Sequence, residues 1–184
     1  MNPCVEVNPS DNALKWVLLH RTQCADWNDY VLSVAQDYEQ ILPYLPEKVD
    51  SILDIGCGLA GIDILLKQRY PDARLMLLDS DGPPENWACN FASEMLPFMQ
   101  RAETERFLES NGVKVDQWLD VGTKETLSAD LIISLYSWGW HYPLETYRVK
   151  GLAIADLRGT SKGKLIAPVI VNGKHKGNRC AFEC

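Results

Sequence analysis

Two kinds of apolar spacing follow each other in the middle of the chain. Residues Ser51 to Gly82 read SILDIGCGLAGIDILLKQRYPDARLMLLDSDG, and both Ile52–Ile55 and Leu75–Leu78 are short apolar runs typical of strands buried on both faces. The segment between them has apolar residues at helical spacing and ends before Pro71. The stretch therefore predicts a βαβ unit whose first turn is rich in glycine. These glycines are Gly56, Gly58 and Gly61.

Strand-like and helix-like patterns continue on both sides of this unit. Helical spacing predicts helices over 11–21, 27–42, 83–110 (bent near Pro97) and 144–157, and Ser10 or Asp11 is a suitable cap for the first of them. Apolar runs predict further strands over 113–119, 131–135, 163–171 and 178–184. Strands that alternate with helices in this way indicate an α/β fold with a doubly wound, mostly parallel sheet.

Composition narrows the class of protein. A chain of 184 residues with 46% hydrophobic and 23% charged residues predicts one globular domain. Its net charge of -7 argues against binding to duplex nucleic acid, which depends on positive charge. The chain lacks an apolar run long enough for a membrane span and lacks a signal-peptide core at its N-terminus. Its six cysteines form no Cys-x-x-Cys pair, which predicts reduced thiols in a cytoplasmic protein and no zinc site.

The acid before the glycine turn distinguishes between two kinds of nucleotide ligand. The spacing Gly56-x-Gly58-x-x-Gly61 also fits the dinucleotide fingerprint, so the glycines alone decide little. Asp54, however, lies two residues before Gly56 at the exit of a buried strand. A pyrophosphate is repelled by a carboxylate at that point, whereas a ligand that carries a cation is attracted. The ammonium and sulfonium of S-adenosylmethionine provide such a cation.

The stretch LDIGCGLAG, followed by LLDSDG, resembles the first two motifs of the class I S-adenosylmethionine-dependent methyltransferases. The resemblance covers roughly Val49 to Tyr147, and its first motif is the specific part. One departure is Ala60, which stands where many members carry a third glycine.

The resemblance implies a Rossmann-like sheet of order 3-2-1-4-5 with a final antiparallel strand beside the fifth. Only about a dozen residues follow Val171, too few for another crossover helix and two strands, so the C-terminus is expected to be shortened. We expect one methyltransferase domain over 1–184, with an N-terminal helical cap over 1–46 and the core over 47–184.

The same resemblance implies a donor site for S-adenosyl-L-methionine, with S-adenosyl-L-homocysteine as the product. Asp79, at the exit of the second strand, has two oxygens suited to both ribose hydroxyls. For the adenine amino group, Asp116 and Asp120 are both candidates, because members often use a residue after the third strand. The predicted donor-binding residues are Asp54, Gly56, Cys57, Gly58, Asp79, Ser80, Asp116, Asp120 and Ser134.

The loop after the fourth strand is the expected acceptor site, because it leaves the sheet beside the first turn. It reads YSWGWHY from Tyr136 to Tyr142, and it lacks the Asn/Asp-Pro-Pro-Tyr and Pro-Cys motifs of nucleic-acid base methyltransferases. His141 is the candidate general base, although it could equally brace the following helix. Only Glu145 lies near this motif, so we predict no metal. The predicted substrate-binding residues are Trp27, Tyr30, Tyr136, Trp138, Trp140 and Tyr142; the alternative is that these aromatics only pack in the interior.

These features predict methyl transfer to a hydroxyl or amine of a small molecule. Residues 158–181 contain basic residues and no acid, which would suit an anionic acceptor; the plainer interpretation is a solvated hairpin. Two other functions stay open. One is a non-catalytic relative that binds S-adenosylmethionine or a protein partner, which the shortened C-terminus favours. The other is a nicotinamide-dependent oxidoreductase, which Asp54 and the lack of a second catalytic domain disfavour.

Overall fold

The computed structural model describes residues 9–21, 23–81, 99–140, 143–157, 165–171 and 174–184, with backbone alone for 165–171 and 174–178. Its helices are α1 (Asp11–His20), α2 (Trp27–Ile41), α3 (Gly61–Arg69) and α4 (Arg101–Ser110), with 3-10 turns η1 (Leu42–Tyr44) and η2 (Leu144–Thr146). Its strands are β1 (Ser51–Ile55), β2 (Arg74–Leu78), β3 (Gln117–Leu119), β4 (Thr126–Ser134), β5 (Arg148–Asp156), β6 (Leu165–Val171) and β7 (Lys174–Glu183). Across these ranges, each helix is too short or too polar to cross a bilayer.

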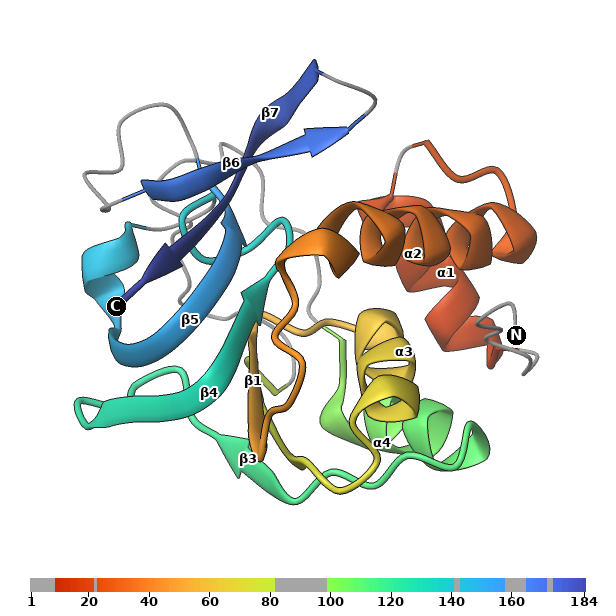
Figure 1. Ribbon diagram of the computed structural model, residues 1–184. Helices are drawn as coiled ribbons and strands as arrows, with labels where there is room; N and C mark the ends of the chain where they lie inside the picture. Colours follow the sequence, from red (N-terminus) through yellow and green to blue (C-terminus); the bar gives the residue numbers. More distant parts are fainter. Residues whose placement is uncertain (1–8, 22, 82–98, 141–142, 158–164, 172–173) are drawn as a thin grey trace.

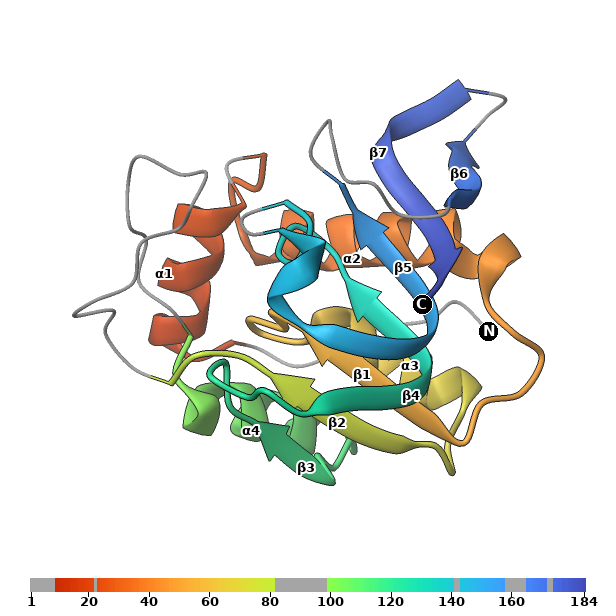
Figure 2. The same ribbon diagram turned by 90° about the vertical axis from the view of Figure 1, so that its left-hand side faces the viewer.

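The described strands form one seven-stranded sheet of order β3-β2-β1-β4-β5-β7-β6 (Figures 1 and 2). Neighbouring strands from β3 to β5 run parallel, and β7 is antiparallel to β5. This confirms the predicted Rossmann-like order 3-2-1-4-5 with the chain's last strand antiparallel beside the fifth. The sheet holds one strand more than expected, because β6 pairs antiparallel with β7 and forms the edge.

Two predicted segments are corrected. The segment 144–157, predicted as a helix, forms η2 and then the fifth parallel strand β5. The segment 163–171, predicted as that fifth strand, contributes the edge strand β6 instead. Of the helix predicted over 83–110, the described part is α4, and residues 82–98 lie outside the described residues.

A glycine and a bulge explain why 148–156 is a strand. Gly151 has a φ of 144°, a conformation that no helix contains and that few residues other than glycine adopt. A Cβ built on Gly151 would lie 1.8 Å from the Ala129 carbonyl oxygen, because β4 is bulged between Ser128 and Leu131. Beyond the bulge, the last four residues of β5 are all buried, as in a central strand covered on both faces.

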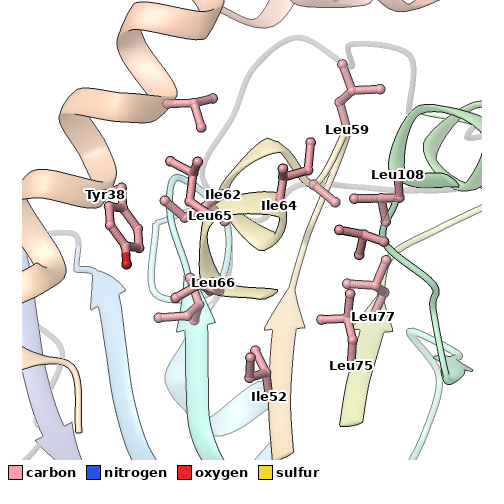
Figure 3. Close-up of a cluster of buried hydrophobic side chains, with 14 of the residues drawn as sticks. Tyr38, Ile52, Leu59, Ile62, Ile64, Leu65, Leu66, Leu75, Leu77 and Leu108 are labelled. Carbon is pink, nitrogen blue, oxygen red and sulfur yellow. The ribbon is translucent and has the colours of Figure 1, made fainter. Parts of the chain in front are cut away.

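The four helices pack on one face of the sheet (Figures 1 and 2). Side chains from all four meet alternate residues of β1, β2 and β4 there, and Figure 3 shows the part of this core around α3. Labelled in that view are Tyr38, Ile52, Leu59, Ile62, Ile64, Leu65, Leu66, Leu75, Leu77 and Leu108. The packing leaves α1 and α2 against the carboxyl ends of the central strands, where a ligand would bind.

The opposite face has a second core, which strands, η2 and loops alone build within the described residues. Trp138 and Tyr147 are its largest buried side chains, at 1% and 5% exposure. Residues 120–125 alone separate β3 from β4, so no helix makes this crossover. The described part of the sheet is therefore covered by helices on one side only.

Candidate functional site

The glycine turn between β1 and α3 has a backbone that side chains would disturb. Gly56 and Gly58 have φ angles of 74° and 54°, and Ala60, which caps α3, is also left-handed at 59°. The Gly56 N–H donates to the Leu78 carbonyl at 2.7 Å and so holds the turn against the end of β2. Glycine at these positions leaves the backbone open to close approach by a ligand.

Asp79, at the exit of β2, is bonded to this turn. One carboxylate oxygen accepts the Gly58 N–H at 2.7 Å and the other accepts the Ser80 N–H at 2.7 Å. Burial raises the pKa of Asp79 to about 6, against the opposing effect of these two backbone donors. Asp79 is therefore mostly ionised at neutral pH. The oxygen bonded to Ser80 keeps a lone pair for a hydroxyl donor, and the oxygen bonded to Gly58 also accepts from the weak Cys57 S–H donor at 3.9 Å.

Two more carboxyl groups lie buried behind the turn. Asp54 on β1 is 3% exposed and Asp63, in the first turn of α3, is 0% exposed. Burial raises the pKa of Asp54 well above its usual range, and the neighbouring Asp63 and then Asp79 raise it further. Burial also raises the pKa of Asp63, to about 7. Such shifts are typical of functional sites.

The N-terminal helices cover the glycine turn directly. A Cβ on Gly58 would lie 2.5 Å from the indole of Trp16 in α1, and one on Gly61 would lie 2.4 Å from the hydroxyl of Tyr30 in α2. Trp16 in turn stacks on His20, with ring centroids 4.3 Å apart. Glycine at 58 and 61 thus makes room for aromatic side chains of the cap as well as for a ligand.

A small cavity of about 30 Å³ lies between the cap and the turn. Its walls carry opposite charges, because Asp54 and Asp37 line it together with Arg21, the residue that ends α1. The cavity is also lined by Tyr30 from the cap and by Gly56 and Leu135 at the ends of β1 and β4. The volume is close to the share of one water in the liquid, so any nucleoside-sized ligand needs Trp16 or its neighbours to move.

The other predicted donor residues near the turn fall into two groups. Cys57 and Ser80 lie beside Asp79: the Cys57 Sγ is 3.9 Å from a carboxylate oxygen of Asp79, and Ser80 donates its N–H to the other. Burial, and then the nearby carboxylates, raise the pKa of Cys57 well above its usual range, so its thiol stays protonated. Ser134 is fully buried, donates to the Ile55 carbonyl and accepts the Trp138 N–H, and so it holds β1 and β4 together.

The two candidates for the adenine lie at opposite ends of β3. Asp116 precedes the strand and accepts the Leu75 N–H at 2.8 Å, which places it at the amino end of β2, away from the glycine turn. Asp120 follows the strand at the carboxyl edge, exposed, with an ion pair of 2.9 Å to Arg101. The Arg101 guanidinium also donates to the Asp79 carbonyl, so it connects the ends of β2 and β3. The structure brings Asp120, and not Asp116, to the edge that carries Asp79.

The predicted acceptor aromatics are divided between the core and the edge. Trp138 lies in the core of the helix-free face and donates its ring N–H to the Leu144 carbonyl at 2.9 Å. Tyr136 faces the cap and donates its hydroxyl to Asp37 at 3.1 Å, while Trp140 is half-buried in the turn after it. Trp27 packs edge-on against Phe107 of α4, away from the cavity. His141 and Tyr142 lie outside the described residues.

A buried ionic network joins the cap to the last strand. Arg179 of β7 is 2% exposed and donates to both carboxylate oxygens of Asp156, at 2.9 and 3.0 Å. It also donates to Asp37 of α2 at 2.8 Å and to Gln40 at 2.7 Å. Asp37 additionally pairs with Arg21 at 3.4 Å. One member of the basic segment thus serves to hold the fold, and the side chains at 158–178 are not described.

Sequence reasoning missed four residues of this region. They are Trp16, Arg21, Asp37 and Asp63. Asp63 carried a usable signal, because a lone acid among Ile62, Ile64 and Leu65 on a buried helix is unusual unless it has a partner. For the others the signal is tertiary, because nothing local shows that residues of the cap reach the glycine turn. In the described part of the chain, no cluster of three His, Cys, Asp or Glu side chains is arranged to hold a metal ion.

Comparison with known proteins gives low-identity structural similarities only. No family model matches the sequence, and no curated protein matches it. Among solved structures, the chain is similar to the StiE O-MT segment (TM-score 0.49, 11% identity, covering 84% of this chain and 54% of that one). It is also similar to the O-methyltransferase TomG from Streptomyces achromogenes, in complex with SAM (0.39, 17%, 82% and 67%).

A third similar structure is coclaurine N-methyltransferase, bound to N-methylheliamine and SAH (TM-score 0.42, 17% identity, covering 69% of this chain and 35% of that one). The chain spans about half the length of the first two structures found, at 54% of each.

Proposed function

We propose that the chain binds S-adenosylmethionine at the glycine turn and transfers its methyl group to a hydroxyl or amine of a small molecule. The observation that carries the proposal is the pair of opposite charges in the cavity beside that turn. Asp54 and Arg21 both line this cavity. A carboxylate suits the ammonium of an amino acid and a guanidinium suits its carboxylate, so the two together suit the methionine end of the donor.

The rest of the carboxyl edge suits the nucleoside end. Asp79 is held by the Gly58 and Ser80 N–H groups, and it can accept two ribose hydroxyls when the weak Cys57 S–H donor turns from its carboxylate to the Gly58 carbonyl. Asp120 follows β3 at the same edge and is the proposed acceptor for the adenine amino group. When bound, S-adenosylmethionine supplies a methyl group already activated by its sulfonium. The protein then needs only to align the acceptor and to exclude water.

The cap must open to admit such a ligand. Trp16 lies against Gly58, and the cavity is only about 30 Å³. We propose that α1 moves away from the turn when the donor enters and that Trp16 and Tyr30 then close over it. Such closure would exclude water from the reacting groups.

For the acceptor, the loop 136–142 remains the proposed wall, with Tyr136 and Trp140 as its described candidates. His141 remains the proposed base, because a histidine titrates near neutral pH and its loop leaves β4 beside the glycine turn. His141→Ala is expected to keep donor binding and lower turnover by about 10²–10⁴-fold. If it instead lowers the melting temperature and keeps turnover per folded molecule, His141 only braces the fold.

Donor binding is tested by calorimetry. The wild-type chain is titrated with S-adenosylmethionine and, separately, with NAD; the proposal requires the first to bind and the second not to. Asp79→Ala is expected to weaken S-adenosylmethionine binding by about 10- to 150-fold, from the loss of hydrogen bonds to a charged group. Asp72→Ala, which removes an exposed carboxylate beyond α3, is the matched control and should bind like the wild type. Unchanged affinity in Asp79→Ala would refute the assignment.

A second candidate function shares the donor site but lacks methyl transfer. The covered turn and the core position of Trp138 also fit a non-catalytic protein that binds S-adenosylmethionine without turning it over. Incubation with S-adenosylmethionine and a mixed pool of hydroxyl and amine acceptors separates the two. Formation of S-adenosylhomocysteine that depends on the pool supports the enzyme; binding without any product supports the alternative.

A further inference from the structure

Asp54 and Asp63 form an isolated acidic pair behind the glycine turn. Both are almost fully buried, at 3% and 0% exposure. Among the described residues, neither oxygen of Asp63 has a hydrogen-bond partner, and its carboxyl lies close enough to that of Asp54 to raise the pKa of Asp54. Two ionised carboxylates cannot donate to each other, so this contact becomes a hydrogen bond only when one of them holds a proton.

We propose that Asp54 and Asp63 share one proton in the free protein and that a cationic amino group binding at Asp54 expels it. The inference rests on the proposed function for the identity of that group. Asp54 lines the cavity and Asp63 does not, so Asp63 acts through Asp54 as a positioning residue. The balance is simple: the proton leaves to the buffer, and the ammonium takes over as the counter-charge of the pair.

The surroundings leave few other places for that proton. Facing the pair are Arg21 from the end of α1, Tyr30 and Asp37 from α2, Cys57 from the turn and Asp79 from β2. Burial raises the pKa of Tyr30 and of Cys57 above their usual ranges, so both keep their own protons at neutral pH. Asp79 is bonded to two N–H groups and has a pKa of about 6, so it is the first of the three carboxyls to ionise.

Proton expulsion makes donor affinity depend on pH. The raised pKa values of the pair mean that the free protein holds the proton at pH 6–7, and a nearby ammonium lowers them. The affinity for S-adenosylmethionine should therefore rise with pH, by up to about tenfold per pH unit between roughly 6 and 7.5. Above about pH 8 the rise should stop, because the α-amino group of the ligand itself loses its proton.

Calorimetry at pH 6.5 in two buffers of different ionisation enthalpy counts the protons released on binding. The wild type should release close to one proton per S-adenosylmethionine, and Asp63→Asn should release far less, because the asparagine N–H replaces the shared proton. The affinity of Asp63→Asn should also lose most of its pH dependence below pH 7.5. Asp72→Asn, an exposed change of the same charge, should behave like the wild type.

The outcomes separate this inference from the proposed function. Binding without proton release in the wild type, or equal release in Asp63→Asn, would overturn the inference while leaving S-adenosylmethionine as the ligand. Absence of binding would overturn both the proposed function and the expulsion step. Whether Asp54 and Asp63 share a proton is then tested in the free protein, by ¹³C NMR titration of the aspartate carboxyl carbons. Asp79 has a pKa of about 6 and itself gives one titration near neutral pH. A further carboxyl that titrates near neutral pH or above in the wild type and is absent from Asp63→Asn or Asp54→Asn supports sharing; ordinary titration of both Asp54 and Asp63 refutes it.

Discussion

Replacement of Arg179 by methionine tests whether the buried ionic network holds the cap onto the sheet. Methionine keeps an unbranched apolar stem but removes a guanidinium that is 2% exposed and donates to Asp156, Asp37 and Gln40. Both carboxylates would stay buried: Asp156 would keep only the Tyr136 N–H, and Asp37 would keep Arg21 and the Tyr136 hydroxyl.

Removal of one partner of a buried ion pair costs about 3–5 kcal/mol, because the remaining charge is left uncompensated. A domain of this size has a free energy of unfolding of about 5–15 kcal/mol, so Arg179→Met should lose roughly a fifth or more of it. The midpoint of thermal unfolding should fall by roughly 6–20 °C. Urea unfolding followed by tryptophan fluorescence measures the free energy, and calorimetry measures the midpoint.

Two further variants make the test specific. Lys48→Met removes an exposed ion pair to Asp50, 3.2 Å long with side chains 82% and 80% exposed, and should cost less than about 1 kcal/mol. The double variant Arg179→Met/Asp156→Leu should be less destabilised than the sum of its single changes, because it leaves only one carboxylate without its partner. A loss below about 1 kcal/mol in Arg179→Met, or strict additivity in the double variant, would refute the reasoning.

Three more perturbations test other parts of the structure. Gly151→Ala should lower the free energy of unfolding by more than about 1 kcal/mol, because the new Cβ would lie 1.8 Å from the Ala129 carbonyl oxygen. Gly112→Ala is the control: Gly112 has a φ of 73°, but a Cβ there would meet no atom within 4 Å. In the same urea experiment it should lower the free energy of unfolding by less. Relative to the wild type, Asp63→Asn should be more stable at pH 8 than at pH 5 by at most about 3 kcal/mol, because about two pKa units of the shift lie above pH 5. The sign follows because a folded-state pKa of about 7, raised from 3.8, gives stability at low pH that is lost as pH rises through 7. Trp16→Ala should speed S-adenosylmethionine association in stopped-flow fluorescence, and an unchanged rate would show that α1 does not limit entry.

Local patterns predicted the part of the fold that local forces determine. The turn around Gly56 and Gly58, with Asp54 before it and Asp79 after the next strand, is a short-range unit, and the structure has its strands, turn and helix where predicted. Helices α1 and α2 were also predicted within a residue or two, because Ser10 caps the first and Asp26 the second. The strand order 3-2-1-4-5 was implied by the resemblance to the methyltransferase family, because doubly wound sheets occur in more than one order.

The errors lie where the sheet overrides local preference. The segment that became β5 has a helix-compatible run of Leu, Ala and Ile. Its place between β4 and β7, together with the conformation of Gly151, makes it extended. Arg179 was interpreted as one charge of a solvated segment, because its partners Asp37 and Asp156 are far away in sequence. Asp116 and Asp120 looked equivalent because the apolar pattern near them is weak. It does not show that β3 begins only at Gln117, which places Asp116 before the strand and Asp120 after it.

The bond between Asp37 and Arg179 also bears on how the chain is made. The two residues are 142 positions apart. At a synthesis rate of about 5–20 residues per second, Asp37 is added to the chain roughly 7–28 s before Arg179. During that interval the carboxylate of Asp37 stays hydrated, and the apolar face of α2 stays exposed because the sheet is incomplete. Nascent chains of this protein should therefore depend on chaperones until the final strand is complete, and a slowed ribosome should lengthen that dependence.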